Sequence, residues 1–232
     1  MRKGDAKRQA ILDTAQRLFF QKGFEQTSVQ DILDVLACSK GSFYHHFESK
    51  LSVLETLCAQ RAEEAADKAR RLMPKCEELT DKLNLLFYCL FPLRKGEEAF
   101  MSLLLPLTSS KEGTSLNYQY AKALAESFEP LMDELLAIAN ATEVCHPVRL
   151  EGMSALILDM YNQCWQKMAE AVIAHLGSRE PLEPAELQPL LNLYRGSVER
   201  LLDAPYGSMV FIELEEVCQA CTQVLNKLRL EM

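Results

Sequence analysis

The stretch SKGSFYHHFESK, residues 39–50, decides our interpretation of this chain. It is rich in aromatic, imidazole and lysine side chains, and its first serine is suited to cap a short helix over residues 40–46. Phe43 and Phe47 lie four positions apart, so they share one face of that helix and are expected to be buried. The remaining faces are expected to be exposed, and they carry Lys40, Ser42, Tyr44 and His45.

Two further helices are predicted ahead of this stretch. The first covers about residues 5–22 and is followed by Gly23, which suits the left-handed residue that ends many helices. Thr27 and Gln30 have the spacing of a capping box, which predicts a second helix that ends near Ala37. Two short helices joined by a tight turn and braced by a third are typical of a helix-turn-helix motif, which places its second helix in the DNA major groove.

Helical periodicity continues through the rest of the chain, where Pro, Gly and Asn mark the breaks and no convincing strand is found. The sequence therefore predicts an all-α fold. A three-helix helix-turn-helix domain over residues 1–50 is followed by a connecting helix over 50–72 and a larger helical bundle over 73–232. Within the bundle, helices are predicted at about 76–91, 96–106, 115–128, 130–141, 147–176, 184–203 and 208–230.

Composition restricts the class of protein. With 48% hydrophobic residues the chain can bury a substantial core, and no apolar run is long enough to cross a bilayer, so we expect a cytoplasmic protein with no membrane partner. Residues 1–50 contain 8 Lys+Arg and 6 Asp+Glu, a net charge of +2. The other residues contain 17 and 27, a net charge of -10. A polyanion is attracted to the first part and repelled by the second.

Motifs of enzymes and metal proteins are not found in the sequence. It has no Ser/His/Asp order, no HExxH, no phosphate loop and no Glu-x-x-His pair, so we predict no enzyme activity, no metal and no cofactor. His45 and His46 are adjacent and diverge on a helix, which does not suit a shared metal ion. The eight cysteines are scattered through apolar segments, which favours reduced, buried thiols. Cys218 and Cys221 are interpreted as core residues, with a redox switch as the alternative.

Residues 7–58 resemble the DNA-binding domain of TetR-type (TetR/AcrR) transcriptional regulators. The resemblance covers the first quarter of the chain and is specific, because several separated elements fall at the family's intervals. These elements are the pattern A..LF...G at Ala15, Leu18, Phe19 and Gly23, the Thr27 that opens the second helix, the segment SKGSFYHHF, and Lys50 three residues after Phe47.

The resemblance implies a homodimer that binds double-stranded DNA at a pseudo-palindromic operator, most often as a repressor. It also implies a C-terminal domain that dimerises and binds a small-molecule ligand, whose binding releases the operator. By position, the residues implied to contact DNA are Thr27, Ser28, Ser39, Lys40, Gly41, Ser42, Tyr44 and His45, with Lys50 contacting a phosphate.

Two positions depart from the family's pattern. Ala37 stands where the turn commonly has Gly, and strain of about 1 kcal/mol follows if the turn requires a positive φ there. Leu33 stands where Ala is common, and this larger side chain is expected to shift the packing between the second and third helices. Neither departure removes an implied DNA contact.

Ligand and dimer residues are predicted in the larger domain, although the same apolar side chains are also suited to a core. The pocket candidates are Phe87, Tyr88, Phe91, Phe100, Met101, Tyr118, Tyr161 and Trp165. The predicted helix over 147–176 has two apolar faces, one for its own core and one for a second subunit. The dimer candidates are Leu156, Met160 and Cys164 on that helix and Val217, Cys221, Leu225 and Leu228 on the last helix.

The alternative function is a helical adaptor whose N-terminal helices bind a protein partner instead of DNA. A net charge of only +2 in residues 1–50 leaves room for that alternative. The sequence identifies neither the ligand nor the operator, and it does not distinguish an inducer from a co-repressor.

Overall fold

The structure is a computed structural model that describes residues 3–109, 111–147, 149–177, 180 and 182–231. The described residues form ten α-helices and two short 3-10 helices, with no strand, which confirms the predicted all-α fold. The helices are α1 Lys3–Lys22, α2 Val29–Leu36, α3 Lys40–Tyr44, α4 Lys50–Leu72, α5 Leu79–Leu90, α6 Glu98–Leu104, α7 Lys111–Ala141, α8 Met153–Ala174, α9 Pro184–Leu202 and α10 Leu214–Glu231, with 3-10 helices η1 at Met73–Lys75 and η2 at Leu105–Ser109.

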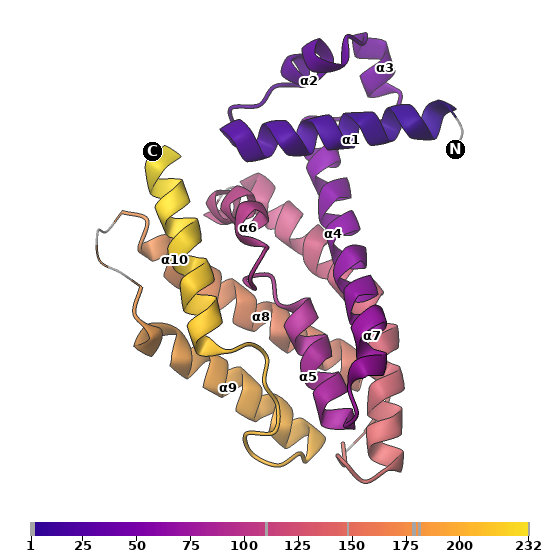
Figure 1. The fold of residues 1–232 in the computed structure, drawn as a ribbon, viewed down its shortest axis with the longest axis vertical. Helices are drawn as coiled ribbons and strands as arrows, with labels where there is room; N and C mark the ends of the chain where they lie inside the picture. The colour runs from indigo at the N-terminus through magenta and orange to yellow at the C-terminus, as the bar shows by residue number, and fades with distance from the viewer. Residues whose placement is uncertain (1–2, 110, 148, 178–179, 181, 232) are drawn as a thin grey trace.

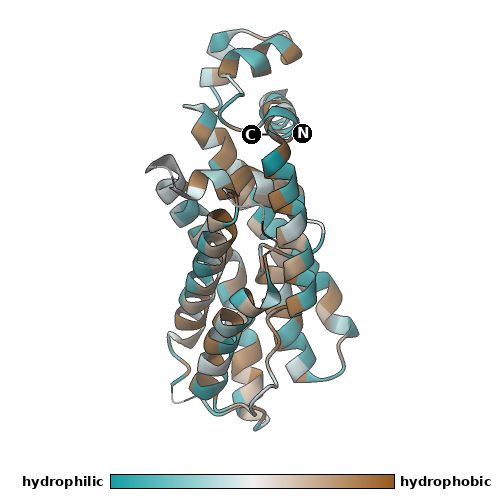
Figure 2. Cartoon of the chain, turned by 90° about the vertical axis from the view of Figure 1, so that its left-hand side faces the viewer, coloured by the Kyte–Doolittle hydropathy of each residue, from teal (hydrophilic) through white to brown (hydrophobic). Residues whose placement is uncertain are grey.

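The three N-terminal helices stand at one end of an elongated helical bundle (Figures 1 and 2). Helix α1 packs against α2 and against the first part of α4, while α2 packs against α3. Below them α4 runs along α7, and α5, α8, α9 and α10 complete the bundle. No helix of the described chain is both long and apolar enough to cross a bilayer.

The start of α2 lies one residue later than the predicted capping box. Ser28 is the cap: its Oγ accepts a hydrogen bond from the Asp31 amide at 3.1 Å, and the Asp31 carboxylate accepts one from the Ser28 amide at 2.7 Å. Thr27 is buried, and its hydroxyl donates to the Gly23 carbonyl at 2.7 Å. The predicted Thr27–Gln30 box is therefore wrong, because Thr27 closes the preceding turn and does not cap the helix.

The turn between α2 and α3 requires a positive φ at Ala37. This residue has φ 46° and ψ 47°, the left-handed conformation that favours glycine. The expectation of strain depended on a positive φ at Ala37, and the structure shows that φ. Leu33 is buried beside the turn, and its carbonyl accepts a hydrogen bond from the Cys38 amide at 3.1 Å.

Three predicted helix boundaries in the bundle are wrong, and one of them is the start of the last helix, α10, which begins at Leu214 and not near residue 208. Pro130 does not separate two helices, since α7 continues through it to Ala141. A proline in a helix leaves the carbonyl four residues earlier without its amide partner, and here that residue, Glu126, is exposed, so water can satisfy the carbonyl. Helix α8 begins at Met153 and not near residue 147, because Gly152 has φ 77°, outside the helical region.

Candidate nucleic-acid interface and ligand groove

Helix α3 lies at the end of the molecule, away from the bundle (Figure 1). Ser39 caps it, accepting a hydrogen bond from the Ser42 amide at 3.3 Å. Phe43 is fully buried and Phe47 nearly so, with ring centroids 6.1 Å apart, whereas Tyr44 is 54% exposed. The predicted division of this stretch into buried aromatics and an exposed polar side is confirmed.

Most of the residues implied to contact DNA are accessible to a second molecule. Ser42 is half-buried, and the exposed ones are Ser28, Ser39, Lys40, Gly41, Tyr44 and His45. The set combines hydroxyl groups, one ammonium, one phenol and one imidazole, which are side chains that bind phosphate oxygens and base edges. Their contact with DNA remains a prediction.

Two of the implied contact residues are engaged inside the domain. Thr27 is 1% exposed, and its hydroxyl donates a hydrogen bond to the Gly23 carbonyl. The Lys50 ammonium donates to the Phe24 carbonyl at 2.7 Å and lies 4.1 Å from the centroid of the Phe24 ring. Lys50 thus joins the start of α4 to the loop between α1 and α2, and a phosphate contact by Lys50 requires this ammonium to be shared.

A carboxylate at the start of α2 lies beside the surface implied to face DNA. Hydrogen bonds from Ser28 and from Lys22 hold the pKa of Asp31 well below its usual range. The Lys22 ammonium lies 2.9 Å from the Asp31 carboxylate. Because Lys22 offsets this charge and the carboxylate also accepts a hydrogen bond from the Ser28 amide at the start of α2, Asp31 has a structural role and does not prevent the approach of a polyanion.

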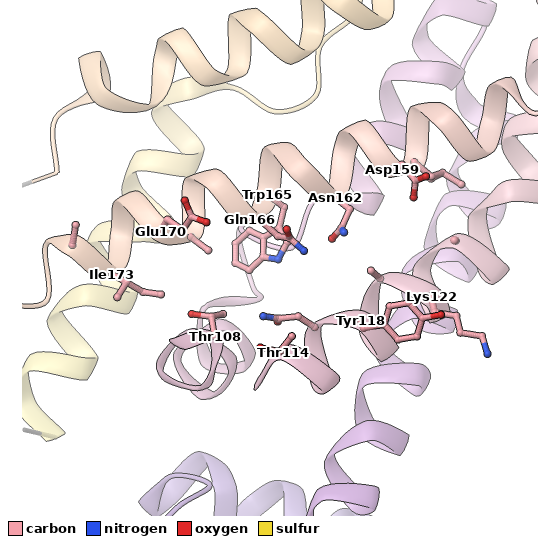
Figure 3. Close-up of a pocket in the computed structure, with 16 residues that line it drawn as sticks. Thr108, Thr114, Tyr118, Lys122, Asp159, Asn162, Trp165, Gln166, Glu170 and Ile173 are labelled. Carbon is pink, nitrogen blue, oxygen red and sulfur yellow. The ribbon is translucent and has the colours of Figure 1, made fainter. Parts of the chain in front are cut away.

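A groove of about 860 Å³ lies between the first half of α7 and the part of α8 from Leu158 to Ala174. Trp165 of α8 extends into the space between the two helices, as does Asn162, while Tyr118 and Lys122 stand on α7 (Figure 3). The walls also contain small residues and amides, namely Ala121 and Ala125, Ala169, Asn117 and Gln166. Its volume is within the range that suits a small molecule.

The predicted pocket residues are divided between this groove and the core. Tyr118 and Trp165 line the groove, and Tyr161 with Trp165 lines a cavity of about 20 Å³ beside it. Tyr88 is half-buried, and its hydroxyl donates to Glu216 at 2.8 Å. The others are fully or almost fully buried and line neither space: Phe87, Phe91, Phe100 and Met101. Ligand contact by any of the eight remains a prediction.

The predicted dimer residues are likewise divided. Leu156 is 45% exposed and Met160 is half-buried, so both have side-chain surface for a partner. Cys164 is buried, as are the four candidates on α10, which packs against α6 and α9: Val217, Cys221, Leu225 and Leu228. These buried side chains serve the chain's own core, so a dimer interface has to be built from other residues.

A partly buried ion network joins the connecting helix α4 to the segment between α5 and α6. The Arg61 guanidinium of α4 lies 3.2 Å from the Glu97 carboxylate, which also lies 3.0 Å from the guanidinium of Arg94. Arg94 is 4% exposed and donates to the Phe91 carbonyl at 2.7 Å. No sequence motif indicated this network, since Arg61 is one of several charged residues in a helical segment and its partner is far along the chain.

The cysteines show no sign of a reactive pair. Burial raises the pKa of Cys221 to about 12 and also raises the pKa of Cys218, so both thiols stay protonated at neutral pH. All eight cysteines are free thiols. Within the described residues, no cluster of three or more His, Cys, Asp or Glu side chains is arranged to hold a metal ion.

Sequence reasoning missed the amides of the groove. Asn162 and Gln166 stand four residues apart on α8, on either side of Trp165, and Asn117 faces them from α7. The signal available was an amide pair at helical spacing around the single tryptophan of the chain. That signal is weak by itself, because such a pair is usually a solvated helix face.

Comparisons with known proteins agree with the N-terminal geometry. Residues 11–57 match the family described as "Bacterial regulatory proteins, tetR family". The uncharacterized HTH-type transcriptional regulator YerO of Bacillus subtilis is 44% identical over 52 residues, which are 22% of this chain and 18% of YerO. The HTH-type transcriptional repressor KstR2 of Rhodococcus jostii is 41% identical over 51 residues, 22% of this chain and 25% of KstR2. The match thus spans a quarter or less of these relatives.

The fold of the whole chain is similar to that of a solved regulator. The transcriptional regulator FadR from Bacillus subtilis, crystallised in complex with stearoyl-CoA, has a TM-score of 0.53 with this chain at 16% identity. The similarity covers 85% of this chain and 98% of FadR. At this identity the likeness is one of fold, and it shows that the helical bundle accompanies the same kind of N-terminal domain in another protein.

Proposed function

We propose that this chain, which belongs to the TetR family by its N-terminal domain, is a homodimeric repressor that a small-molecule ligand releases from a pseudo-palindromic operator. The observation that carries the proposal is the exposed polar side of α3, set on the buried pair Phe43 and Phe47. Such a rigid support holds Tyr44 and Lys40 at fixed positions, as reading of a groove requires.

DNA binding is tested by footprinting with a genomic fragment library, followed by titration of the recovered site. We expect salt-sensitive binding, because phosphate contacts release counterions. Tyr44→Ala is expected to weaken binding about 10-fold, and Lys40→Ala is expected to lower the slope of affinity against salt by about 1. Gln9→Ala, an exposed change on α1, serves as the matched control and should leave affinity unchanged. If no protected site is recovered, the adaptor function takes the place of this proposal.

The dimer is proposed to form through the outer faces of α8 and α9, which pack against each other. Leu193 of α9 is 62% exposed and Leu156 of α8 is 45% exposed, and Met160 adds further apolar surface. Exposed leucines on adjacent helices are suited to a bundle shared by two subunits. Two copies joined in this way would present two α3 helices to successive major grooves roughly 34 to 36 Å apart.

Leu193→Glu tests this interface by placing a charge in it. Sedimentation should show a monomer, and operator affinity should fall because one α3 alone reaches only half of the site. Leu230→Glu is the matched control, since Leu230 is 89% exposed on α10, outside the proposed face. A dimer that survives Leu193→Glu would place the interface elsewhere.

Release by a ligand is supported by the position of the groove. Thr108 of η2 lines it, and η2 continues directly from α6, which packs against α1 of the DNA-binding domain. The other wall of the groove, α7, packs along α4, the helix that leaves the DNA-binding domain. A ligand that changes the separation of α7 and α8 can therefore shift α4 and α6, the two helices that pack against α1. Such a shift would change the spacing of the two α3 helices in the proposed dimer.

A further inference from the structure

We infer that the groove between α7 and α8 takes an uncharged, planar aromatic compound with hydroxyl groups on its edge. This inference deepens the proposed function and rests on it for its regulatory meaning, but the binding itself is a property of the groove. Three features of the groove carry the inference: unpartnered amides, a flat apolar floor and an unfavourable charge for anions.

The amides select for hydroxyl groups. Asn117, Asn162 and Gln166 line the groove and are half-buried, and none of their side-chain carboxamides makes a hydrogen bond in the part of the chain that the structure describes. A carboxamide has two donor hydrogens and an acceptor oxygen, and a hydroxyl group also donates and accepts. A hydroxylated edge can therefore pair with all three amides, whereas a bare hydrocarbon would leave them desolvated and unpaired.

The floor and walls suit a flat ring. Trp165 lines the groove and extends between α7 and α8 with 5% of its surface exposed, so a flat ring bound there would contact the exposed part of the indole (Figure 3). Ala121, Ala125 and Ala169 leave the space beside it open, because their side chains are short. Tyr118, which is 66% exposed, stands at the rim, where its phenol can cover a bound ring.

The charges of the lining disfavour an anion. Lys122 contributes an ammonium group to the lining, and this group lies 3.7 Å from the carboxylate of Glu126. The lining also contains two carboxylates, Asp159 and Glu170, of which only Glu170 has an ion-pair partner, Lys167 at 2.8 Å, among the described residues. Among the described lining residues two carboxylates would repel an anionic ligand, and the one ammonium is already paired with Glu126, so phosphates, sulfonates and carboxylates are disfavoured.

A long alkyl chain is also disfavoured. The adjoining cavity among Leu90, Leu124, Tyr161 and Trp165 measures about 20 Å³, too small for an acyl chain. The lining of the larger groove alternates apolar and amide groups, and a flexible hydrocarbon would cover the amides without pairing them. The shape and the polarity therefore both favour a compact ring.

Binding is tested by isothermal titration calorimetry of the full chain in the absence of DNA, with four probes. Naphthalene-2,7-diol has the proposed ring and hydroxyl groups, naphthalene-2,7-disulfonate keeps the ring but adds negative charge, and naphthalene keeps only the ring. Methyl β-D-glucoside keeps hydroxyl groups but has no aromatic ring. We expect the diol to bind at least about 10-fold more tightly than each of the other three. Quenching of the chain's single tryptophan, Trp165, should accompany binding of the diol.

Variants then place the diol in the groove. Asn162→Leu and Gln166→Leu should each weaken binding about 5-fold, since each replaces a hydrogen-bonding side chain by an apolar one of similar volume. Gln119→Leu is the matched control: Gln119 is an exposed amide of α7 outside the lining, and its replacement should leave the affinity unchanged. A thermal melt of each variant shows whether the fold is retained.

The possible results separate the ligand class from the proposed function. Equal or tighter binding of the disulfonate, preference for the glucoside, no binding of the diol, or full affinity in both amide variants would each overturn the inferred ligand class. If the diol binds as expected but no operator is recovered, the groove is a binding site and the repressor function is wrong. If an operator is recovered but the diol does not bind, the repressor function stands with another ligand class.

Discussion

The helix-turn-helix domain and the groove of the bundle are built in opposite ways. The exposed polar side of α3 comes from residues that are neighbours in the sequence. The N-terminal ends of α2, α3 and α4 are capped by serines that accept hydrogen bonds from amides three positions later. The groove instead lies between two helices, α7 and α8, whose lining residues are more than thirty positions apart in the sequence. A site made of local structure is readable in sequence, while a site made by the separation of two helices is not.

Phe43→Ala is expected to have the largest effect and to show that the two regions unfold separately. Phe43 is fully buried in the small N-terminal domain, and removal of its ring should cost about 4 kcal/mol. Hydrogen exchange should show loss of protection in α1 to α3 while the bundle stays protected. Tyr44→Ala, a neighbouring aromatic that is 54% exposed, is the control and should leave stability within about 0.5 kcal/mol.

Gly113→Ala is expected to damage the bundle and not the N-terminal domain. A methyl group at Gly113 would overlap the backbone carbonyl of Leu107 in η2, so η2 must move away from α7. We expect a loss of about 3 kcal/mol, measured by chemical denaturation, with reduced affinity for any ligand of the groove. Gly4→Ala, where no atom lies within 4 Å of the added methyl group, is the control. Unchanged stability in Gly113→Ala would show that the contact between η2 and α7 is looser than described.

Ala37→Gly is expected to stabilise the helix-turn-helix domain. Glycine adopts the φ of 46° found at Ala37 without the steric cost that a methyl group imposes. The gain should be about 1 kcal/mol in the free energy of unfolding of this domain, measured by denaturation of the full chain. Asp203→Gly, at φ 50° after α9, is the matched change in the bundle and should leave the N-terminal transition unchanged. A destabilised Ala37→Gly would mean that the methyl group makes a useful contact.

The smallest expected effect is the acid dependence that Asp31 gives to the same domain. Hydrogen bonds from Ser28 and Lys22 lower the pKa of Asp31 in the folded state below its ordinary value. The stability that these bonds contribute is therefore fully present above the ordinary carboxyl pKa and is lost as the pH falls through the lowered one. Asp31→Asn should flatten the acid limb of a stability curve for the N-terminal domain. An acid limb identical to that of the natural chain would remove Asp31 from this role.

The sequence predicted the N-terminal domain closely because its signals are local. The capping serine Ser39, the four-residue spacing of Phe43 and Phe47, and glycine at position 23 each act within one helical turn. The capping box was placed one residue early because Thr27 and Ser28 are both good caps, and only the burial of Thr27 distinguishes them. Lys50 was expected to be free for a phosphate, and the carbonyl of Phe24 that binds it lies 26 residues earlier.

In the bundle, the sequence predicts the helices but not how they pack against one another. The apolar faces of the helices over 153–174 and 214–231 show which residues are buried. The same pattern suits a core, a ligand pocket or an interface with a second subunit. The structure assigns most of the predicted pocket and dimer residues to the core. It leaves Leu156 and Leu193 exposed and places Trp165 in the lining of a groove whose amides gave only a weak signal in the sequence.

The sequence by itself determined that this chain is helical, that its N-terminal helices form a helix-turn-helix similar to that of TetR-family regulators, and which side of α3 is polar. Periodicity, caps and turn residues determine these features, because they depend on neighbours within a few positions. The tertiary structure alone decided where α7 separates from α8, which aromatic residues are core, and that Arg61 meets Glu97 and Arg94. Those outcomes depend on how whole helices pack, and the same apolar pattern permits several packings.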